Sequence, residues 1–209
     1  MTAMHFREFL EESRTNTLHA FDMDETLFAH NPKKLKIHVK DEHGKTVKSL
    51  TNQEFNKHKL QPGHHYDFGD FKKASTFGKS AKPIHKMINK ARSLQQRGHK
   101  VEILTARSDL DDKEKFAHHL NKHGIDIGKI HVRRAGNIEG TSTGDRKRKV
   151  LSGLIRKHGY KEVHLYDDDA GNHRHFAKLK DDHPHVKLVS HIVHHNDKTG
   201  ETKVQTMRH

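Results

Sequence analysis

Short strand-like runs alternate with segments of helical periodicity along most of this chain, and few folds accommodate that alternation. The apolar runs typical of strands lie at residues 18–21, 101–104, 130–132, 163–166 and 186–193. Segments whose apolar residues recur three and four positions apart separate most of these runs, as in amphipathic helices. Strands joined through single helices form a parallel sheet with helices on both faces. The sequence therefore predicts an α/β fold with a Rossmann-like parallel sheet, built as a single domain over residues 1–209.

An inserted segment at residues 30–83 interrupts this rhythm soon after the first strand. The segment is polar and lysine-rich, and its residues 36–40 alternate between apolar and polar as a strand does. A turn at residues 41–44 and a second run at residues 46–48 predict a β-hairpin. We expect the insertion to form a small flap or cap beside the sheet.

The charge and the residue types of the chain narrow its partners. Lys and Arg number 40 against 27 Asp and Glu, which gives a net charge of +13. Such an excess favours nucleic acid or another phosphorylated partner, although lysines that only keep the protein soluble would produce it equally well. The chain has no cysteine, which excludes a disulfide scaffold, a cysteine nucleophile and a thiolate metal site.

The apolar runs are too short to span a membrane, and the first residues lack the unbroken apolar stretch of a signal peptide. We therefore expect a cytoplasmic protein, in the host cytoplasm if phage-encoded, that binds no membrane. The 24 histidines recur in pairs within polar surroundings, and no segment offers a compact zinc ligand set. We expect most of them to lie at the surface. The sequence leaves the oligomeric state open.

The clearest chemical signal lies at residues 21–28, where an apolar strand ends in Asp22 and Asp24. A spacing of two keeps both carboxylates on one side of an extended backbone. Two close carboxylates attract a hard divalent cation, and Mg²⁺ prefers a few carboxylates together with water and substrate phosphate. One carboxylate can attack phosphorus while the other transfers a proton. A solvent-exposed acidic turn would look the same in isolation.

Further polar groups follow the ends of other elements. Thr105 and Arg107 follow a second strand and offer a hydroxyl and a fixed cation for phosphate oxygens. Asp167–Asp169 follow another strand and add carboxylates for a metal. The basic segment at residues 144–149 can neutralise charge on a transferring phosphoryl group. Because ligands of parallel sheets bind beyond the carboxyl ends of the strands, we expect these groups to meet at one rim.

In combination, these residues resemble the haloacid dehalogenase-like (HAD) phosphohydrolase superfamily over roughly residues 15–193. Asp22-Met23-Asp24-Glu25-Thr26 matches its D-x-D-x-T signature, and Leu104-Thr105 matches its hydrophobic strand ending in Thr or Ser. Lys147 matches the expected lysine, and Tyr166-Asp167-Asp168 matches the acidic pair at a strand end.

The resemblance implies a HAD-like sheet, dependence on Mg²⁺ and an aspartyl-phosphate intermediate. Asp22 would be the nucleophile, and Asp24 the general acid and then the general base. Thr105 and Lys147 would hold the phosphoryl group. Lys149 competes with Lys147 for this role, because the start of the helix is uncertain by a turn.

The resemblance also implies the ligands of the metal. They would be Asp22, the carbonyl of Asp24, and Asp168 or Asp167. The choice among the aspartates at residues 167–169 stays open.

The residues around 105–107 and 144–147 are also locally similar to the phosphatase half of bacteriophage polynucleotide kinase-phosphatases, and the chain has no kinase phosphate loop. A cap that is only a hairpin would leave the site open to a phosphate on a large substrate. We therefore expect a phosphatase that acts on a nucleic-acid end or a nucleotide.

Two alternatives keep the same fold. One is a phosphatase of a small phosphometabolite, and the other is a non-catalytic basic binding or structural protein. The opening at residues 5–12 is similar to short F-x-x-F-L-x-E openings of some tailed-phage proteins, which would suit a virion-associated role. An ordinary first helix turn explains that segment more simply.

Overall fold

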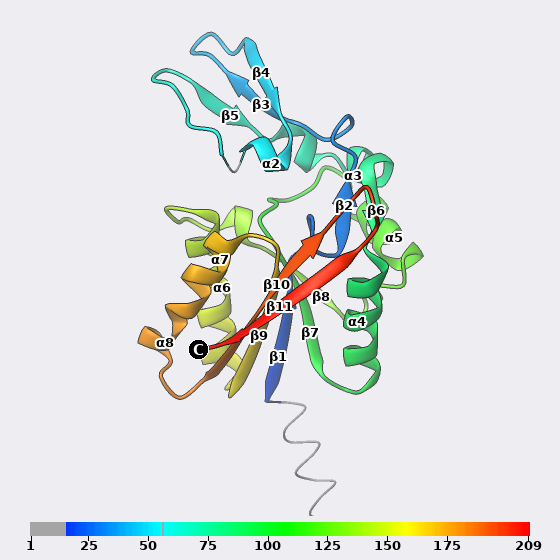
Figure 1. Cartoon of the computed structure of the whole chain (residues 1–209), viewed down its shortest axis with the longest axis vertical. Coiled ribbons are helices and arrows are strands. Elements are labelled where there is room, and N and C mark those ends of the chain that lie inside the picture. The colour runs from blue at the N-terminus through cyan, green and yellow to red at the C-terminus, as the bar shows by residue number, and fades with distance from the viewer. Residues whose placement is uncertain (1–15, 56) are drawn as a thin grey trace, which may run out of the picture.

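The computed structural model describes residues 16–55 and 57–209, so the opening at residues 5–12 lies outside the described part. Its centre is a six-stranded sheet of order β11-β10-β9-β1-β7-β8 (Figure 1). Neighbouring strands run parallel except β10 and β11, which are antiparallel. The strands are β1 (Thr17–Phe21), β7 (Lys100–Thr105), β8 (His131–Arg134), β9 (Glu162–Asp167), β10 (Lys187–His195) and β11 (Thr202–Arg208).

Helices flank this sheet on both faces, as the alternation predicts. On one side of the sheet, α4 (His85–Gln96) and α5 (Lys113–Lys122) pack in one hydrophobic cluster. The other cluster includes α6 (Thr143–His158) and α7 (Ala170–Ala177), with the short α8 (Leu179–Asp182). The fold is thus mixed α/β with a mostly parallel central sheet, an architecture compatible with a Rossmann-like fold.

The two clusters follow from the alternation of side chains along the strands. Leu18 and Ala20 of β1 belong to the cluster of α6, whereas Phe21 belongs to the cluster of α4.

The ends of α6 follow ordinary capping rules. Ser142 caps the start of α6 by accepting from the backbone N–H of Asp145, and Gly159 ends this helix in the left-handed conformation at φ 68°. The described chain contains no helix that is both long and apolar enough to cross a membrane.

The insertion is larger than the predicted hairpin. Its strands β3 (Ile37–Lys40) and β4 (Thr46–Leu50) form the expected pair, but β5 (His65–Asp67) joins β3 as a third antiparallel strand. A flap made only of a hairpin is therefore wrong: the insertion is a small cap with its own buried cluster, centred on Ile37, Val39 and Leu50. β5 has only three residues, too few for its alternation to be recognised in the sequence.

The cap also contains short helices and a two-stranded connection to the core. Figure 1 shows the three-stranded sheet of the cap beyond one end of the central sheet. The strands β2 (Phe28–His30) and β6 (Ala81–Pro83) pair with each other where the chain enters and leaves the insertion. The helical segments of the cap are α2 (Asn52–Phe55), the 3₁₀ turn η1 (Gly69–Lys72) and α3 (Ala74–Ser80).

The histidines depart in part from the expectation of surface positions. Most described histidines are at least partly exposed, but His19, His30 and His173 are buried. His19 lies in β1 and His173 in α7, both at positions that face the interior. Polar sequence neighbours are therefore a poor guide to burial here, because strand alternation and helix rotation decide which side chains face inward.

Candidate active site

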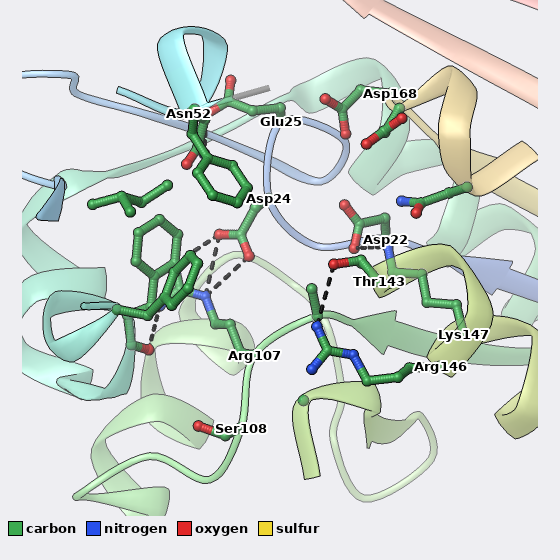
Figure 2. A pocket seen from close by; sticks show the side chains of 18 of the residues that line it. Asp22, Asp24, Glu25, Asn52, Arg107, Ser108, Thr143, Arg146, Lys147 and Asp168 are labelled. Atoms are coloured by element: carbon green, nitrogen blue, oxygen red, sulfur yellow. Dashed lines mark hydrogen bonds and ion pairs between the residues drawn. The ribbon is translucent and has the colours of Figure 1, made fainter. Parts of the chain in front are cut away.

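A pocket of about 430 Å³ lies between the carboxyl ends of the central strands and the cap. Figure 2 shows Asp22, Asp24, Lys147 and Asp168 around it, with Arg107 contacting Asp24. Its core-side lining is charged, whereas its cap-side lining is rich in phenylalanine. The predicted meeting of polar groups at one rim of the sheet is therefore found for most of them.

Three carboxylates form a cluster at this rim. Ligand oxygens of Asp22, Asp167 and Asp168 lie within 4.8 Å of one another. They meet because β1 and β9 are neighbours in parallel register, with Phe21 opposite Tyr166. The backbone N–H of Asp22 also donates to the carbonyl of Tyr166 at 2.8 Å. An oxygen-only donor set of this kind suits a hard divalent cation, so the triad could hold a metal ion.

The structure separates Asp169 from the other two of the three consecutive aspartates. Asp167 and Asp168 both belong to the carboxylate cluster. Asp169 instead caps α7, where its side chain accepts from the backbone N–H of Gly171. Asn172 donates to both carboxylate oxygens of Asp167 at 2.9 and 3.1 Å, which fixes the orientation of that carboxylate.

Lys147, and not Lys149, reaches the cluster. Its Nζ lies 2.7 Å from Asp22 Oδ1 and 2.7 Å from Asp167 Oδ2, and the residue is only 2% exposed. The Nζ of Lys149 donates instead to the carbonyl of Glu139 at 3.0 Å, away from the cluster. The helix rotation of about 100° per residue turns positions two apart to different sides of α6, which separates the two lysines.

The electrostatics of the cluster favour a cation. Burial raises the pKa of Asp22 to about 8; Lys147 opposes the rise, whereas Asp167 and Asp24 add to it. Burial and the neighbouring Asp167 also hold the pKa of Asp168 well above its usual range. Three carboxylates against one ammonium leave a net negative charge when all are ionised, which a divalent cation would neutralise.

The guanidinium of Arg107 contacts Asp24, and phosphate binding by Arg107 stays a prediction. Its Nη2 lies 2.7 Å from Asp24 Oδ1 and its Nε 3.0 Å from Oδ2. Its Nη1 donates to the carbonyl of Phe71 in the cap at 2.8 Å. All three nitrogens are thus engaged inside the protein, because the loop after β7 turns the side chain toward Asp24.

Asp24 is consequently held as an anion. His30 Nε2 lies 2.6 Å from Asp24 Oδ1, on the side chain that Arg107 also binds. Burial raises the pKa of Asp24, but Arg107 and His30 outweigh burial and bring the pKa well below its usual range. The Asp24 carboxylate is therefore not part of the metal cluster, and the participation of its backbone carbonyl stays a prediction.

Thr105 lies beneath the pocket and not in its lining. The residue is 1% exposed, and its Oγ1 accepts from the backbone N–H of Arg107 at 3.1 Å. The turn that follows it packs closely on Gly136, where a Cβ atom would lie 2.4 Å from the carbonyl oxygen of Ala106. Phosphate binding by Thr105 stays a prediction, and the observed role of its hydroxyl is to shape this turn.

Sequence reasoning missed several residues of the pocket. Arg146 lines it next to Lys147, and its Nη2 donates to Thr143 Oγ1 at 3.4 Å. Glu25 also lines it, in a left-handed conformation at φ 60°, and burial raises its pKa to about 7. The basic run at residues 144–149, which can neutralise charge on a phosphoryl group, indicated a place for Arg146 in the site. Nothing in the sequence distinguished Glu25 from an ordinary acidic turn residue.

The cap contributes the other missed group, which is apolar. Its members line the pocket from the three-stranded sheet and the short helical segments, and they are Ile37, Phe55, Phe68 and Phe71.

Comparison with known proteins adds no family to this description: no protein-family model and no curated protein matches the chain.

Proposed function

We propose that this protein is a Mg²⁺-dependent phosphoric monoester hydrolase of the HAD type. The observation that carries the proposal is the arrangement of Lys147 between Asp22 and Asp167, with Asp168 beside them. A buried carboxylate with an ammonium group and further carboxylates around it provides a nucleophile, a phosphate-binding cation and a metal site in one place. The resemblance of the D-x-D-x-T segment and its partners to the superfamily supports the same assignment.

In this mechanism, the Asp22 carboxylate attacks phosphorus, so that an Asp22–phosphorus bond forms and the bond to the leaving oxygen breaks. Water then attacks phosphorus, releases inorganic phosphate and regenerates the Asp22 carboxylate. Lys147 neutralises charge on the phosphoryl group during both steps. Mg²⁺, held by Asp22 and by Asp167 or Asp168, would polarise the phosphoryl oxygens and offset their charge.

Asp24 would donate a proton to the leaving oxygen and later accept one from the attacking water. Its ion pair with Arg107 makes the carboxylate a weak base and a group that is rarely protonated. Proton transfer at Asp24 therefore requires that this ion pair loosen when substrate enters the pocket.

The preferred substrate is a phosphate on a nucleic-acid end or a nucleotide. The net charge of +13 supports this class, because a basic protein attracts polyanions. A cap that borders the pocket also allows a small phosphometabolite, and activity on sugar phosphates against phosphorylated oligonucleotides would separate the two. A non-catalytic binding protein is the outcome if no ester is hydrolysed.

The first experiment is phosphate release from p-nitrophenyl phosphate with Mg²⁺ and with EDTA, in wild type and Asp22→Asn. We expect Mg²⁺-dependent release that falls at least about 1,000-fold in the variant, because the amide is not a nucleophile. Asp181→Asn, the same substitution at an exposed position of α8, is the matched control. Since selective phosphatases ignore this reagent, an inactive result is followed by 3′- and 5′-phosphorylated oligonucleotides and by sugar phosphates. No activity on any of these esters contradicts the proposal.

A further inference from the structure

The cap presents an aromatic surface to the same pocket that holds the carboxylate cluster. Phe55, Phe68 and Phe71 line this side of the pocket, and we call them the aromatic wall. Phe68 is 39% exposed, although phenylalanine is usually buried. Because Phe68 also lines the pocket, a ligand that enters the pocket can contact its exposed ring.

The geometry of the aromatic wall leaves it available for stacking. The ring centroids of Phe55 and Phe68 lie 5.4 Å apart at an interplanar angle of 85°, and those of Phe68 and Phe71 lie 6.2 Å apart at 74°. Both are edge contacts, so these rings do not stack face to face on one another. A flat ligand ring can therefore stack on Phe68, whereas Arg107 already lies over the ring of Phe71.

Contacts with neighbouring residues hold the aromatic wall in place. Arg107 lies over the ring of Phe71, 4.8 Å from its centroid, and also binds the Phe71 carbonyl. Tyr66 packs against Phe55 at 4.8 Å, and its hydroxyl donates to the carbonyl of His58 at 3.1 Å. A wall fixed in this way loses little side-chain freedom when a ligand binds, which favours affinity.

The aromatic wall and Asp22 line one pocket, so a single ligand can contact both. The two sides are connected through Arg107, which binds Asp24 and lies over the ring of Phe71. A nucleotide carries a phosphate and a flat ring in one molecule, and the pocket of about 430 Å³ is within the range of small-molecule sites.

We infer that the aromatic wall stacks on the nucleobase of the nucleotide that carries the scissile phosphate, with Phe68 as its principal contact. This inference rests on the proposed function and names the part of the substrate that the cap recognises. Base–aromatic stacking tolerates every base, so the cap selects for the presence of a base and not for its identity. The net charge of +13 favours a nucleotide over a phosphotyrosyl peptide as the source of the ring.

The test compares substrates that differ only in the base. For each variant, kcat/KM is measured for adenosine 5′-monophosphate against ribose 5-phosphate, and for adenosine 3′-monophosphate against ribose 3-phosphate. We expect wild type to prefer the base-bearing ester at one position of the phosphate, and Phe68→Ala to lower that preference about 5- to 100-fold. Phe68→Tyr, which keeps a ring, should retain the preference, and Phe68→Leu, which is apolar without a ring, should lose it.

Val47→Ala is the matched control for the loss of an exposed apolar side chain in the cap. Val47 is 49% exposed in β4 and does not line the pocket, so the preference should stay at the wild-type value. Hydrolysis of esters with and without a base at equal kcat/KM, unchanged in Phe68→Ala, overturns the inference and leaves the proposed function intact. Preferred hydrolysis of a phosphotyrosyl peptide overturns the choice of a nucleobase.

If no ester is hydrolysed, the proposed function fails, and binding decides the inference separately. Calorimetric titration of wild type and Phe68→Ala with adenosine 5′-monophosphate and adenosine 3′-monophosphate then gives the answer. Affinity for either nucleotide that falls about 5-fold or more in the variant supports the stacking surface. Absence of binding to both, or equal affinity in the two proteins, overturns it.

Discussion

The two sides of the pocket are built in different ways. The rim of the central sheet carries Asp22 and Asp167 at the ends of hydrogen-bonded neighbouring strands, and Lys147 is fixed on a long helix. The cap carries Phe55 and Phe68 on a four-residue helix and at the edge of a 3₁₀ turn. The regular elements of the rim hold charged groups within hydrogen-bond distance of one another, whereas the cap lines the pocket with apolar side chains. Under the proposed function, the rim performs the chemistry and the cap recognises the leaving group.

Replacement of Lys147 is expected to have the largest effect and tests the rim. Lys147→Met removes the cation between Asp22 and Asp167, so that buried carboxylates face one another without compensation. We expect the free energy of unfolding at pH 7 to fall by about 3–5 kcal/mol, and turnover to be lost for every ester. Urea unfolding measures the first quantity, and Mg²⁺ should restore part of it by binding the folded state.

Lys149→Met is the control, because it makes the same change two residues along α6 on a side chain that binds the carbonyl of Glu139. Its free energy of unfolding should change by less than about 1 kcal/mol. Equal stability of the two variants, with no response to Mg²⁺, would show that the rim is not an electrostatically coupled cluster.

A smaller change at Arg107 tests the connection between the two sides. Arg107→Lys keeps the charge but cannot bind both oxygens of Asp24 and the carbonyl of Phe71 at once. We expect kcat to fall about 10- to 100-fold, equally for esters with and without a base, because lysine no longer fixes the position of Asp24, which under the proposed function would transfer protons in both reactions. Arg156→Lys, on an exposed position of α6, is the control.

The result for Arg107→Lys distinguishes a role of Arg107 in the rim from a role in the cap. A defect shared by all esters belongs to the rim, whereas Phe68→Ala should affect only esters that carry a base. If Arg107→Lys instead lowers activity only toward base-bearing esters, then Arg107 acts through the cap and the division between the two sides is wrong.

The rim could be predicted from the sequence because regular structure determines it. Parallel strands bring Asp22 and Asp167 together once the alternation of strands and helices is recognised. The choice of Lys147 over Lys149 needed the start of α6, which the sequence left uncertain by a turn. The partner of Arg107 could not be predicted, since it depends on the loop after β7. The aromatic wall could not be predicted either: Phe68 lies in an irregular segment, where no periodicity shows which side chains face the pocket.

A third region lies on the central sheet, where three histidine side chains contact one another. The rings of His19 and His164 stack with centroids 4.4 Å apart, and His164 Nδ1 lies 2.9 Å from His191 Nε2. These three histidines come from the neighbouring strands β1, β9 and β10. The charged or titratable groups around them are His99, Lys90, Glu162, His173 and Lys187. The arrangement disfavours protonation, because the rings are close and partly or fully buried.

Acidification is expected to have the smallest effect on the free energy of unfolding, and it acts on the histidines of the central sheet. Burial lowers the pKa of His19 to about 2 and that of His191 to about 4, whereas histidine in an unfolded chain titrates near pH 6.5. The unfolded state therefore binds protons first, so the stabilisation is present above about pH 6.5 and is lost as the pH falls below it. Between pH 7 and pH 6 each of these two histidines should lower the free energy of unfolding by about 0.7 kcal/mol. Because Asp22 and Glu25 titrate in the same range with the opposite sign, the contribution of His19 is read as the difference between wild type and His19→Phe in urea unfolding. His43→Gln, on an exposed turn of the cap, should leave the pH dependence unchanged. A pH dependence that responds to His43 and not to His19 would place the acid-sensitive region in the cap.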